Sequence, residues 1–243
     1  SFAFQLGIAR SLAIAAVRMV AQLALAGAVL KLVFEQASPW LTVAIGVVMV
    51  VIAGFEVWMR QGRSAGLART LGLGTGTLLF VGTLATLLTV AVIIGPQPVM
   101  SPRFVLPILG MVLGNALTAV ALVLDTMTSD AVRDRTAIEA RIALGHSRHQ
   151  ALRETLRHAL KVGTMPIINA MAVCGVVSLP GMMTGQIIAG ADPVEATKYQ
   201  VMIMFVLAGA SALAALLAGL GAIFLLTDDR HRLRLDRLTA IKL

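Results

Sequence analysis

The side chains best suited to chemistry are sulfur ligands beside a break in an apolar segment. Half of the twelve methionines lie between positions 165 and 204. Thioether sulfur binds soft metals such as Cu(I) and some iron centres, although methionine also fills gaps in apolar cores. Met182, Met183 and Gln186 directly follow Pro180 and Gly181. Proline removes a backbone donor and glycine adds freedom, so we predict an unwound turn that forms part of a transport path.

Three acidic residues, Glu56, Asp192 and Glu195, are further candidate metal ligands. A carboxylate inside a bilayer is costly and usually functional, and Glu56 falls within an apolar segment. Glu56 also stands four residues before Arg60, with which it would pair on a helix. Asp192 precedes Pro193, a combination typical of a helix N-cap. From the sequence, metal binding and these structural roles both stay open.

Other polar residues have two interpretations each. Asn115, Tyr199 and Gln200 would either line the transport cavity or hydrogen-bond between helices. His146 and His149 are one helical turn apart, a spacing that can bind a divalent metal. No third ligand is evident near them, so a solvated face is the expected role of these histidines.

The chain has no signature of an enzyme. No Ser/His/Asp or paired-carboxylate arrangement is evident, and Gly72-Leu73-Gly74-Thr75-Gly76 lacks the Gly-Lys-Ser/Thr ending of a phosphate loop. We therefore expect no catalytic residue and no cofactor in this chain. The net charge of +8 could suggest nucleic acid, but aromatic residues make up only 5% of the chain and no groove-reading motif is present. We expect no nucleic-acid partner.

The elements that must position these residues are membrane-spanning helices. The chain is 58% hydrophobic and 13% charged, whereas soluble domains are roughly 45–50% apolar and 25% charged. A span needs about 20 mostly apolar residues, and the sequence predicts six such segments. They cover residues 17–34, 40–58, 71–95, 104–124, 164–189 and 199–226. We therefore predict an all-α, polytopic transmembrane helix bundle that forms a single domain over residues 1–243 and contacts membrane lipid.

Loop charge predicts the orientation, because Lys and Arg favour the cytoplasmic side of a membrane. Alternating the six spans leaves only Lys31, Arg103 and Lys198 on one side and gathers the other cations on the opposite side. Both ends of the chain are therefore predicted to be cytoplasmic, in the inner (plasma) membrane of the cell. Residues 2–16 carry apolar residues at helical spacing, and form either an interfacial helix or the inner end of a long span.

The longest cytoplasmic segment covers residues 125–163. Its apolar residues recur with a period near 3.6 between charged ones, which indicates amphipathic helix. Gly145-His146-Ser147 interrupts the pattern, so we predict a protruding pair of helices. This hairpin is either a solvated loop on the membrane surface or a docking element for a cytoplasmic partner.

Two groups of residues carry a family resemblance. Glu139-Ala140, followed by Leu144-Gly145, resembles the loop by which permease subunits of ABC transporters dock onto their ATPase. A longer pattern resembles the FetB-type permeases, an iron-export family related to plant aluminium-tolerance permeases. It consists of Gly110-Met111, Gly114-Asn115, Ser178-Leu179-Pro180-Gly181-Met182-Met183-Thr184-Gly185-Gln186, Asp192-Pro193 and Lys198-Tyr199-Gln200. Family members usually carry one more helix at the amino end, so we expect an additional N-terminal helix to be missing from this chain.

The resemblance implies the membrane subunit of an ABC exporter that moves iron, or a similar metal ion, out of the cytoplasm. Two copies of the permease would assemble with two copies of a separate ATPase subunit, which would hold ATP and magnesium. The residues that couple to the ATPase would be Glu139, Ala140, Leu144, Gly145, His146 and Ser147. The alternatives are a permease for another metal or an organic solute, and a non-transport membrane scaffold that uses the hairpin only to anchor a partner.

Overall fold

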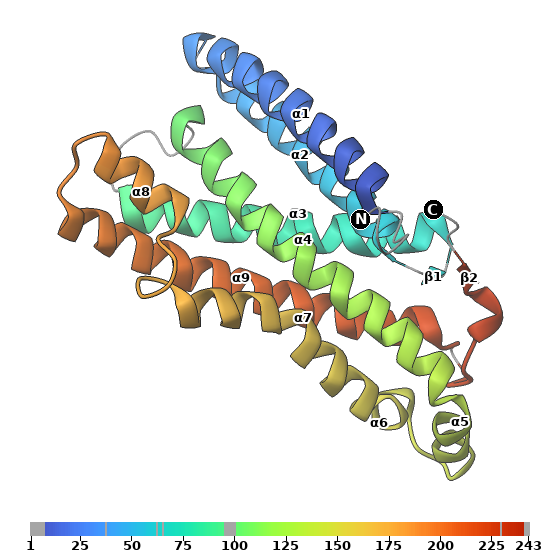
Figure 1. Ribbon diagram of the computed structural model, residues 1–243. Helices are drawn as coiled ribbons and strands as arrows, with labels where there is room; N and C mark the ends of the chain where they lie inside the picture. The colour runs from blue at the N-terminus through green and yellow to red at the C-terminus, as the bar shows by residue number, and fades with distance from the viewer. Residues whose placement is uncertain are drawn as a thin grey trace.

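The predicted all-α architecture is confirmed in the computed structural model, which describes residues 8–36, 38–61, 63–64, 66–94, 101–228 and 230–240. Residues 2–7 of the predicted amphipathic segment and the cation Lys242 lie outside the described residues. The helices in chain order are α1 (Ile8–Gln36), α2 (Pro39–Met59), α3 (Leu67–Thr89) with its π-helical extension η1 (Val90–Ile94), α4 (Pro102–Arg133), α5 (Arg135–Ala143), α6 (Arg148–Ala151), α7 (Arg153–Val173), α8 (Gly181–Ile188) and α9 (Pro193–Leu226). Figure 1 shows their arrangement.

Five helices in the described part of the chain are long and apolar enough to cross a membrane: α1, α2, α3, α4 and α9. Proline at the first turn begins α2, α4 and α9, because the missing amide proton of proline has no partner at that position anyway. With 32 residues, α4 is about 48 Å long, well beyond the roughly 30 Å of a hydrocarbon core. It therefore continues out of the bilayer as a helix.

The fifth predicted span, residues 164–189, is divided between two helices. The structure ends α7 at Val173 and begins α8 at Gly181. A break at Pro180 was expected, but non-helical backbone begins six residues earlier, at Cys174. Gly175, at φ +85°, takes a conformation that favours glycine, and its amide donates to the carbonyl of Ser178 at 2.9 Å. The chain thus makes a closed turn in which backbone groups satisfy one another.

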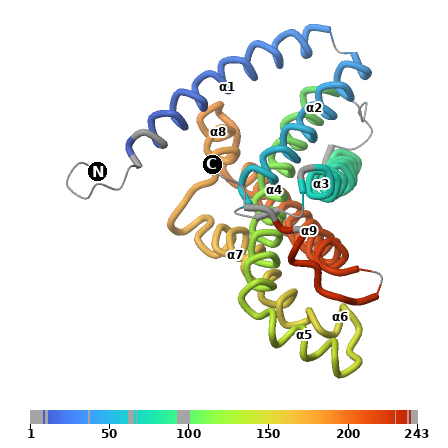
Figure 2. Tube along the Cα trace, turned by 90° about the vertical axis from the view of Figure 1, so that its right-hand side faces the viewer, coloured from blue at the N-terminus to red at the C-terminus, as the bar shows by residue number. Residues whose placement is uncertain are grey.

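The described part of the amino-terminal segment favours one of its two predicted structures, the end of a long helix. Residues from Ile8 onward are continuous with α1, so the described part of this segment is the end of a long helix. Leu12, Val17 and Leu25 of α1 are each more than 60% exposed. In Figure 2, α1 lies at the edge of the molecule. Its apolar surface is therefore available to lipid or to another protein.

Helix α4 lies at the centre of the bundle and contacts α2, α3, α7 and α9. Its residues Val112, Ala116, Val120, Val123 and Met127 are completely buried. They recur every three or four positions, as expected for the inner stripe of a helix. The buried stripe continues past residue 124, where the predicted fourth span ends, so the core extends into the segment predicted to be amphipathic and cytoplasmic.

Two short strands join distant parts of the chain. β1 (Arg63–Ser64), between α2 and α3, pairs antiparallel with β2 (Thr239–Ala240), which follows the 3-10 helix η2 (Leu235–Arg237). Before β2, the chain reverses after α9 through a bridge between Thr227 and Leu233. We call the end of the bundle that holds α5, α6 and residues 227–240 the basic end.

Gly163 sets the closest approach of α7 to α4. A methyl group added at this position would clash with the side chain of Val123 and lie 3.0 Å from the carbonyl oxygen of Ala119. A backbone oxygen cannot move aside cheaply in a packed interior. At this position α7 therefore packs its backbone directly against Val123 and the backbone of α4.

We predict that Gly163→Ala lowers the free energy of unfolding by about 1–3 kcal/mol, the usual cost of overpacking. The matched control is Gly114→Ala on α4, where an added methyl group meets nothing within 4 Å and alanine is the better helix former. Thermal unfolding in detergent measures both. A midpoint for Gly163→Ala equal to that of Gly114→Ala would contradict the close packing.

Candidate functional site

The predicted docking hairpin is present at the basic end. α5 ends at Ala143 and α6 begins at Arg148, with a turn between them at Leu144–Ser147. Gly145 has φ +90°, the left-handed conformation that a side chain disfavours, and the amide of His146 donates to the carbonyl of Arg141 at 3.1 Å. Ser147 begins α6 with a reciprocal capping box to Gln150. Local hydrogen bonds thus define the shape of the hairpin.

One side of the hairpin is fastened to the bundle. Ile138, Ala151 and Leu152 are buried, and Arg141 donates to the carbonyl of Ala151 at 3.1 Å. On α6, the guanidinium of Arg148 lies 4.2 Å from the ring centre of Phe224 on α9, a cation–π distance. The hairpin is therefore held by both apolar packing and polar contacts.

The other side of the hairpin faces outward and contains the predicted coupling residues. Glu139, Ala140, Gly145 and His146 are exposed, and Leu144 is 80% exposed. Glu139 pairs with Arg135 one turn earlier at 2.8 Å. A leucine so exposed at the tip of an ordered turn offers an apolar contact to a partner.

His149 does not join His146 in a metal site. Its ring packs edge-on against Phe224, with 5.6 Å between the ring centres. Within the described part of the chain, no group of three or more His, Cys, Asp and Glu side chains is placed to hold a metal ion.

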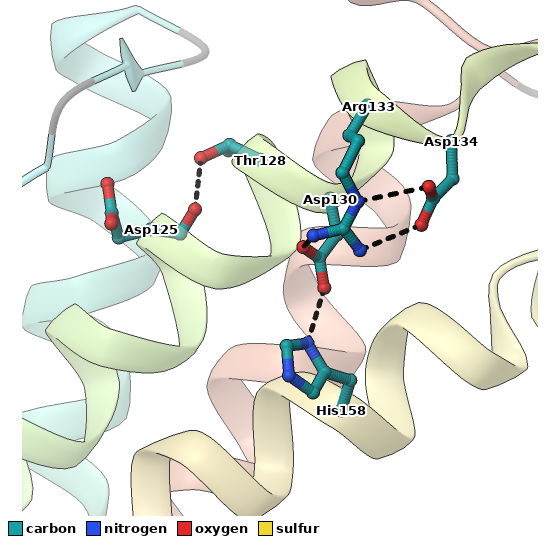
Figure 3. A network of polar contacts seen from close by, with 6 residues as sticks. All are labelled: Asp125, Thr128, Asp130, Arg133, Asp134 and His158. Atoms are coloured by element: carbon teal, nitrogen blue, oxygen red, sulfur yellow. Dashed lines mark hydrogen bonds and ion pairs between the residues drawn. The ribbon is translucent and has the colours of Figure 1, made fainter.

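Sequence reasoning missed a buried carboxylate at the root of the hairpin. Asp130, on the last turns of α4, is only 4% exposed. Its Oδ2 lies 2.6 Å from Nδ1 of His158 on α7, and its Oδ1 lies 3.0 Å from the guanidinium of Arg133. Figure 3 shows the two partners converging on the carboxylate from different helices. The contact ties α4 to α7 on either side of the hairpin.

Arg133 extends this network to the surface. It donates from Nε and Nη2 to Asp134 at 3.1 and 3.0 Å. These charge-assisted hydrogen bonds from Arg133 lower the pKa of the Asp134 carboxyl below its ordinary value. The sequence did contain a signal for Asp130, because it continues the buried spacing of Val123 and Met127. The signal was overlooked because the predicted span ended at residue 124.

The transport-path residues divide between two cavities at the other end of the bundle. A cavity of about 780 Å³ between α4, α8 and α9 is lined by Met182, Gln186 and Tyr199, together with Arg103 and Met111. A second cavity of about 380 Å³ is lined by Met183 and Gln200, together with Met171, Cys174 and Met204. Consecutive residues on a helix point about 100° apart. The predicted pair Met182 and Met183 is therefore split between the cavities.

Two side-chain carbonyl oxygens at these cavities have no hydrogen-bond partner in the described part of the chain. The Oε1 atoms of Gln186 and Gln200 are buried and accept no hydrogen bond from any residue that the structure describes, and Gln200 is only 5% exposed. Buried polar atoms are nearly always satisfied. An unsatisfied carbonyl beside a cavity is available to a bound solute or ion.

Other predicted residues have structural roles. Pro180 and Gly181 form the start of α8, beside the turn described above. Asn115 lines neither cavity, and its side-chain amide donates to the carbonyl of Met111 on its own helix at 2.9 Å. It does not join Tyr199 and Gln200.

The three acids do not gather at one place. Glu56 pairs with Arg18 of α1 at 2.8 Å and with Arg60 at 3.8 Å, near the end of α2. Asp192 caps α9 by accepting from the amides of Val194 and Glu195 at 2.9 and 3.1 Å.

Glu195 pairs with Lys198 at 2.6 Å. Of the metal ligands predicted from the sequence, Met182 and Met183 line cavities, whereas Glu56, Asp192 and Glu195 make these structural contacts. Metal binding by any of the five stays a prediction.

Comparison with known proteins identifies the family of this chain. Residues 1–224 match the family model described as "Uncharacterised protein family (UPF0014)". The chain belongs to the UPF0014 family. Its members include the FetB-type permease and the plant aluminium protein that the sequence resembles. No solved structure matches this UPF0014 chain.

Three relatives illustrate the family. The UPF0014 membrane protein slr1647 of Synechocystis is 34% identical over 78% of this chain and 73% of its own length. The probable iron export permease protein FetB of Escherichia coli is 32% identical over 91% of this chain and 83% of its own length. Protein ALUMINUM SENSITIVE 3 of Arabidopsis thaliana is 31% identical over 82% of this chain and 71% of its own length. The resemblance to FetB-type permeases is thus confirmed, and this UPF0014 chain is a multi-pass membrane permease.

We predict that Asp130→Asn destabilises the protein by about 1.5–3 kcal/mol, because it removes the charged acceptor of a buried hydrogen bond. It should also expose the α5–α6 region to limited proteolysis, since the hydrogen bond between α4 and α7 loses its charged acceptor. The matched control is Asp134→Asn, which removes the neighbouring exposed partner of the same Arg133 and should change both readouts far less. Equal effects of the two variants would show that Asp130 has no special role.

Proposed function

We propose that this permease is the membrane-spanning subunit of an ABC exporter, which moves iron out of the cytoplasm with ATP hydrolysed by a separate subunit. The observation that carries the proposal is the hairpin at the basic end, with one side fastened to α4, α7 and α9 and with Leu144 80% exposed at its tip. A rigid element with an unpartnered apolar tip is suited to dock a protein that must transmit force. The basic end then faces the cytoplasm, as the positive-inside rule requires.

The coupling route follows from contacts. A partner that pushes on Leu144 and Gly145 moves α5 and α6 together, because Arg141 bridges them. Arg148 on Phe224 passes this motion to α9, and the Asp130–His158 contact connects the ends of α4 and α7. Helices α4 and α9 both line the cavity that holds Met182, Gln186 and Tyr199. Docking at one end and the cavity at the other are thus joined by continuous helices.

The substrate proposal rests on the cavities and on the relative named probable iron export permease. Thioether sulfur and amide oxygen are ligands that an iron ion accepts when it sheds water. Methionines line both cavities, and the free Oε1 atoms of Gln186 and Gln200 add oxygen acceptors. Iron is here the transported substrate and would bind only in passage.

Assembly as a homodimer completes the proposal. The second cavity is lined by Phe205, whose side chain is 67% exposed, so this cavity opens to the outside of a single protomer. A second copy packed against this side would enclose it, and symmetric pairs are the commonest oligomers. Two permease copies would then receive two ATPase copies on their two hairpins.

The docking proposal predicts that Leu144→Ser weakens co-purification of the ATPase subunit about tenfold or more, since burying a leucine contributes roughly 1.5–3 kcal/mol. Gly145→Val and the charge reversal Glu139→Arg should act in the same direction. The control is Val176→Ser, which changes a 90% exposed apolar residue far along the chain, between α7 and α8. Retention of the ATPase by all three hairpin variants would refute docking at this site.

The transport proposal is tested in inside-out vesicles that contain the permease and its ATPase. We expect ATP-dependent uptake of iron in preference to manganese, zinc, copper and aluminium. Gln186→Leu and Gln200→Leu should reduce this uptake without lowering stability, because each removes a buried carbonyl that has no protein partner. ATPase co-purification is the control for assembly. Uptake of another metal or an organic solute instead of iron would reject the substrate, and no ATP-dependent uptake at all would leave a membrane scaffold.

A further inference from the structure

A groove between α7 and α9, close to the basic end, has features that the proposed transport does not use. Its cavity of about 860 Å³ is lined on α7 by Arg153, Arg157 and Lys161 and on α9 by Leu216. The three cations are spaced four residues apart, so they form one stripe along the helix. Leu156 and Leu160 lie beside the stripe and also line the groove.

The three cations of the stripe are not paired with carboxylates of the described residues. Among the residues that the structure describes, Arg153, Arg157 and Lys161 have no ion pair or side-chain hydrogen bond, and all three are exposed. Of the described residues that line the groove, Glu154 is the one acid, which leaves an excess of positive charge among them. Four arginines at this end differ in this respect: Arg133, Arg135, Arg232 and Arg234 each pair with a carboxylate.

The stripe lies where α7 changes from charged to apolar. After Lys161 the helix continues through Val162 and Thr164 into an apolar sequence that ends at Val173. Residues 153 to 161 rise about 12 Å along the axis, which more than covers the headgroup layer of one leaflet, roughly 5–8 Å. The stripe is therefore long enough to reach phospholipid phosphates when the apolar part of α7 lies in the bilayer.

The rest of the groove suits an acyl chain. Leu160 and Thr164 on α7 face Ala212 and Leu216 on α9, and Leu216 is 42% exposed. The helices approach closely beneath them, since a methyl group on Gly219 would lie 2.5 Å from Leu156. The two helices are thus in close contact at the level of Arg153 and Arg157, and the apolar residues Leu160, Ala212 and Leu216 line the groove farther from the basic end.

We propose that this groove binds one anionic phospholipid, with its phosphate between Arg157, Lys161 and Arg153 and an acyl chain along Leu160 and Leu216. Basic pockets between helices at the cytoplasmic face are suited to anionic headgroups. The lipid would also brace the hairpin, because α7 follows directly after α6. This site requires only that the apolar part of α7 and the helix α9 lie in a bilayer, so it does not depend on iron transport or on the ATPase.

The test is retention of phosphatidylglycerol and phosphatidylcholine by the purified full chain, measured by native mass spectrometry from detergent. The wild-type chain should retain one phosphatidylglycerol in preference to phosphatidylcholine. The triple variant Arg153→Gln, Arg157→Gln, Lys161→Gln should bind phosphatidylglycerol more weakly by about fivefold per lost cation, on the order of a hundredfold in all. Arg153→Lys with Arg157→Lys keeps the charge and should keep most of the binding.

Two controls separate this site from general attraction. The triple variant Arg69→Gln, Arg135→Gln, Arg230→Gln removes three exposed cations outside the groove and should retain the lipid. Soluble glycerol phosphate, which lacks the acyl chain, should not displace it. The melting temperature in nanodiscs confirms folding of each variant and should rise with phosphatidylglycerol only when the stripe is intact.

Three results would overturn the proposal. These are equal retention of the two lipids by the wild-type chain, equal losses in the two triple variants, and displacement by glycerol phosphate. Unchanged lipid retention combined with loss of ATPase co-purification in the stripe variant would also overturn it, and would assign the groove to the protein partner.

Discussion

Hydrocarbon offers no hydrogen-bond partner to a peptide group, and the whole arrangement depends on this constraint. The chain satisfies it with helices that run without interruption for up to 34 residues. Helical structure stops within an apolar stretch between α7 and α8, where the turn after Val173 closes on its own backbone groups. Both cavities with unsatisfied amide oxygens lie beside this departure from regular helix. The place where the backbone is hardest to satisfy is also the place where a passing ion would find acceptors.

Helix α4 connects the two ends of the molecule. It lines the larger cavity with Met111 and carries Asp130 at its other end, where His158 and Arg133 hold the carboxylate. A buried carboxylate is tolerated only with such partners. A displacement of the hairpin that keeps this contact must shift α7 relative to the bundle together with α4. The two ends of the molecule are therefore connected by one continuous helix.

Much of the fold could be predicted from the sequence, because the bilayer imposes length and polarity on each span. The hairpin was predicted from its amphipathic period and from Gly145, and the structure places that glycine at a positive φ. The arrangement of the candidate site residues was harder to predict from the sequence. Whether Met182 and Met183 share a cavity depends on the rotation of α8 against two other helices, and this rotation leaves no local signature.

Contacts of polar residues could be predicted when the partners are close in sequence, but not when they are far apart. The cap at Asp192 and the pairing of Glu56 with Arg60 were foreseen, because both depend on neighbours in sequence. The contact between Asp130 and His158 joins positions 28 residues apart. It could have been suspected only by extending the buried stripe of α4 beyond its apolar run.

The pairing of β1 with β2 has a mechanical consequence. Because residues 63–64 are hydrogen-bonded to residues 239–240, the chain from α3 to the tail after α9 forms a ring closed by non-covalent bonds. The segment between α2 and α3 cannot move away from the segment that follows α9 unless the hydrogen bonds between β1 and β2 break first. The ladder thus acts as a tether that limits how far the two halves of the bundle part at the basic end.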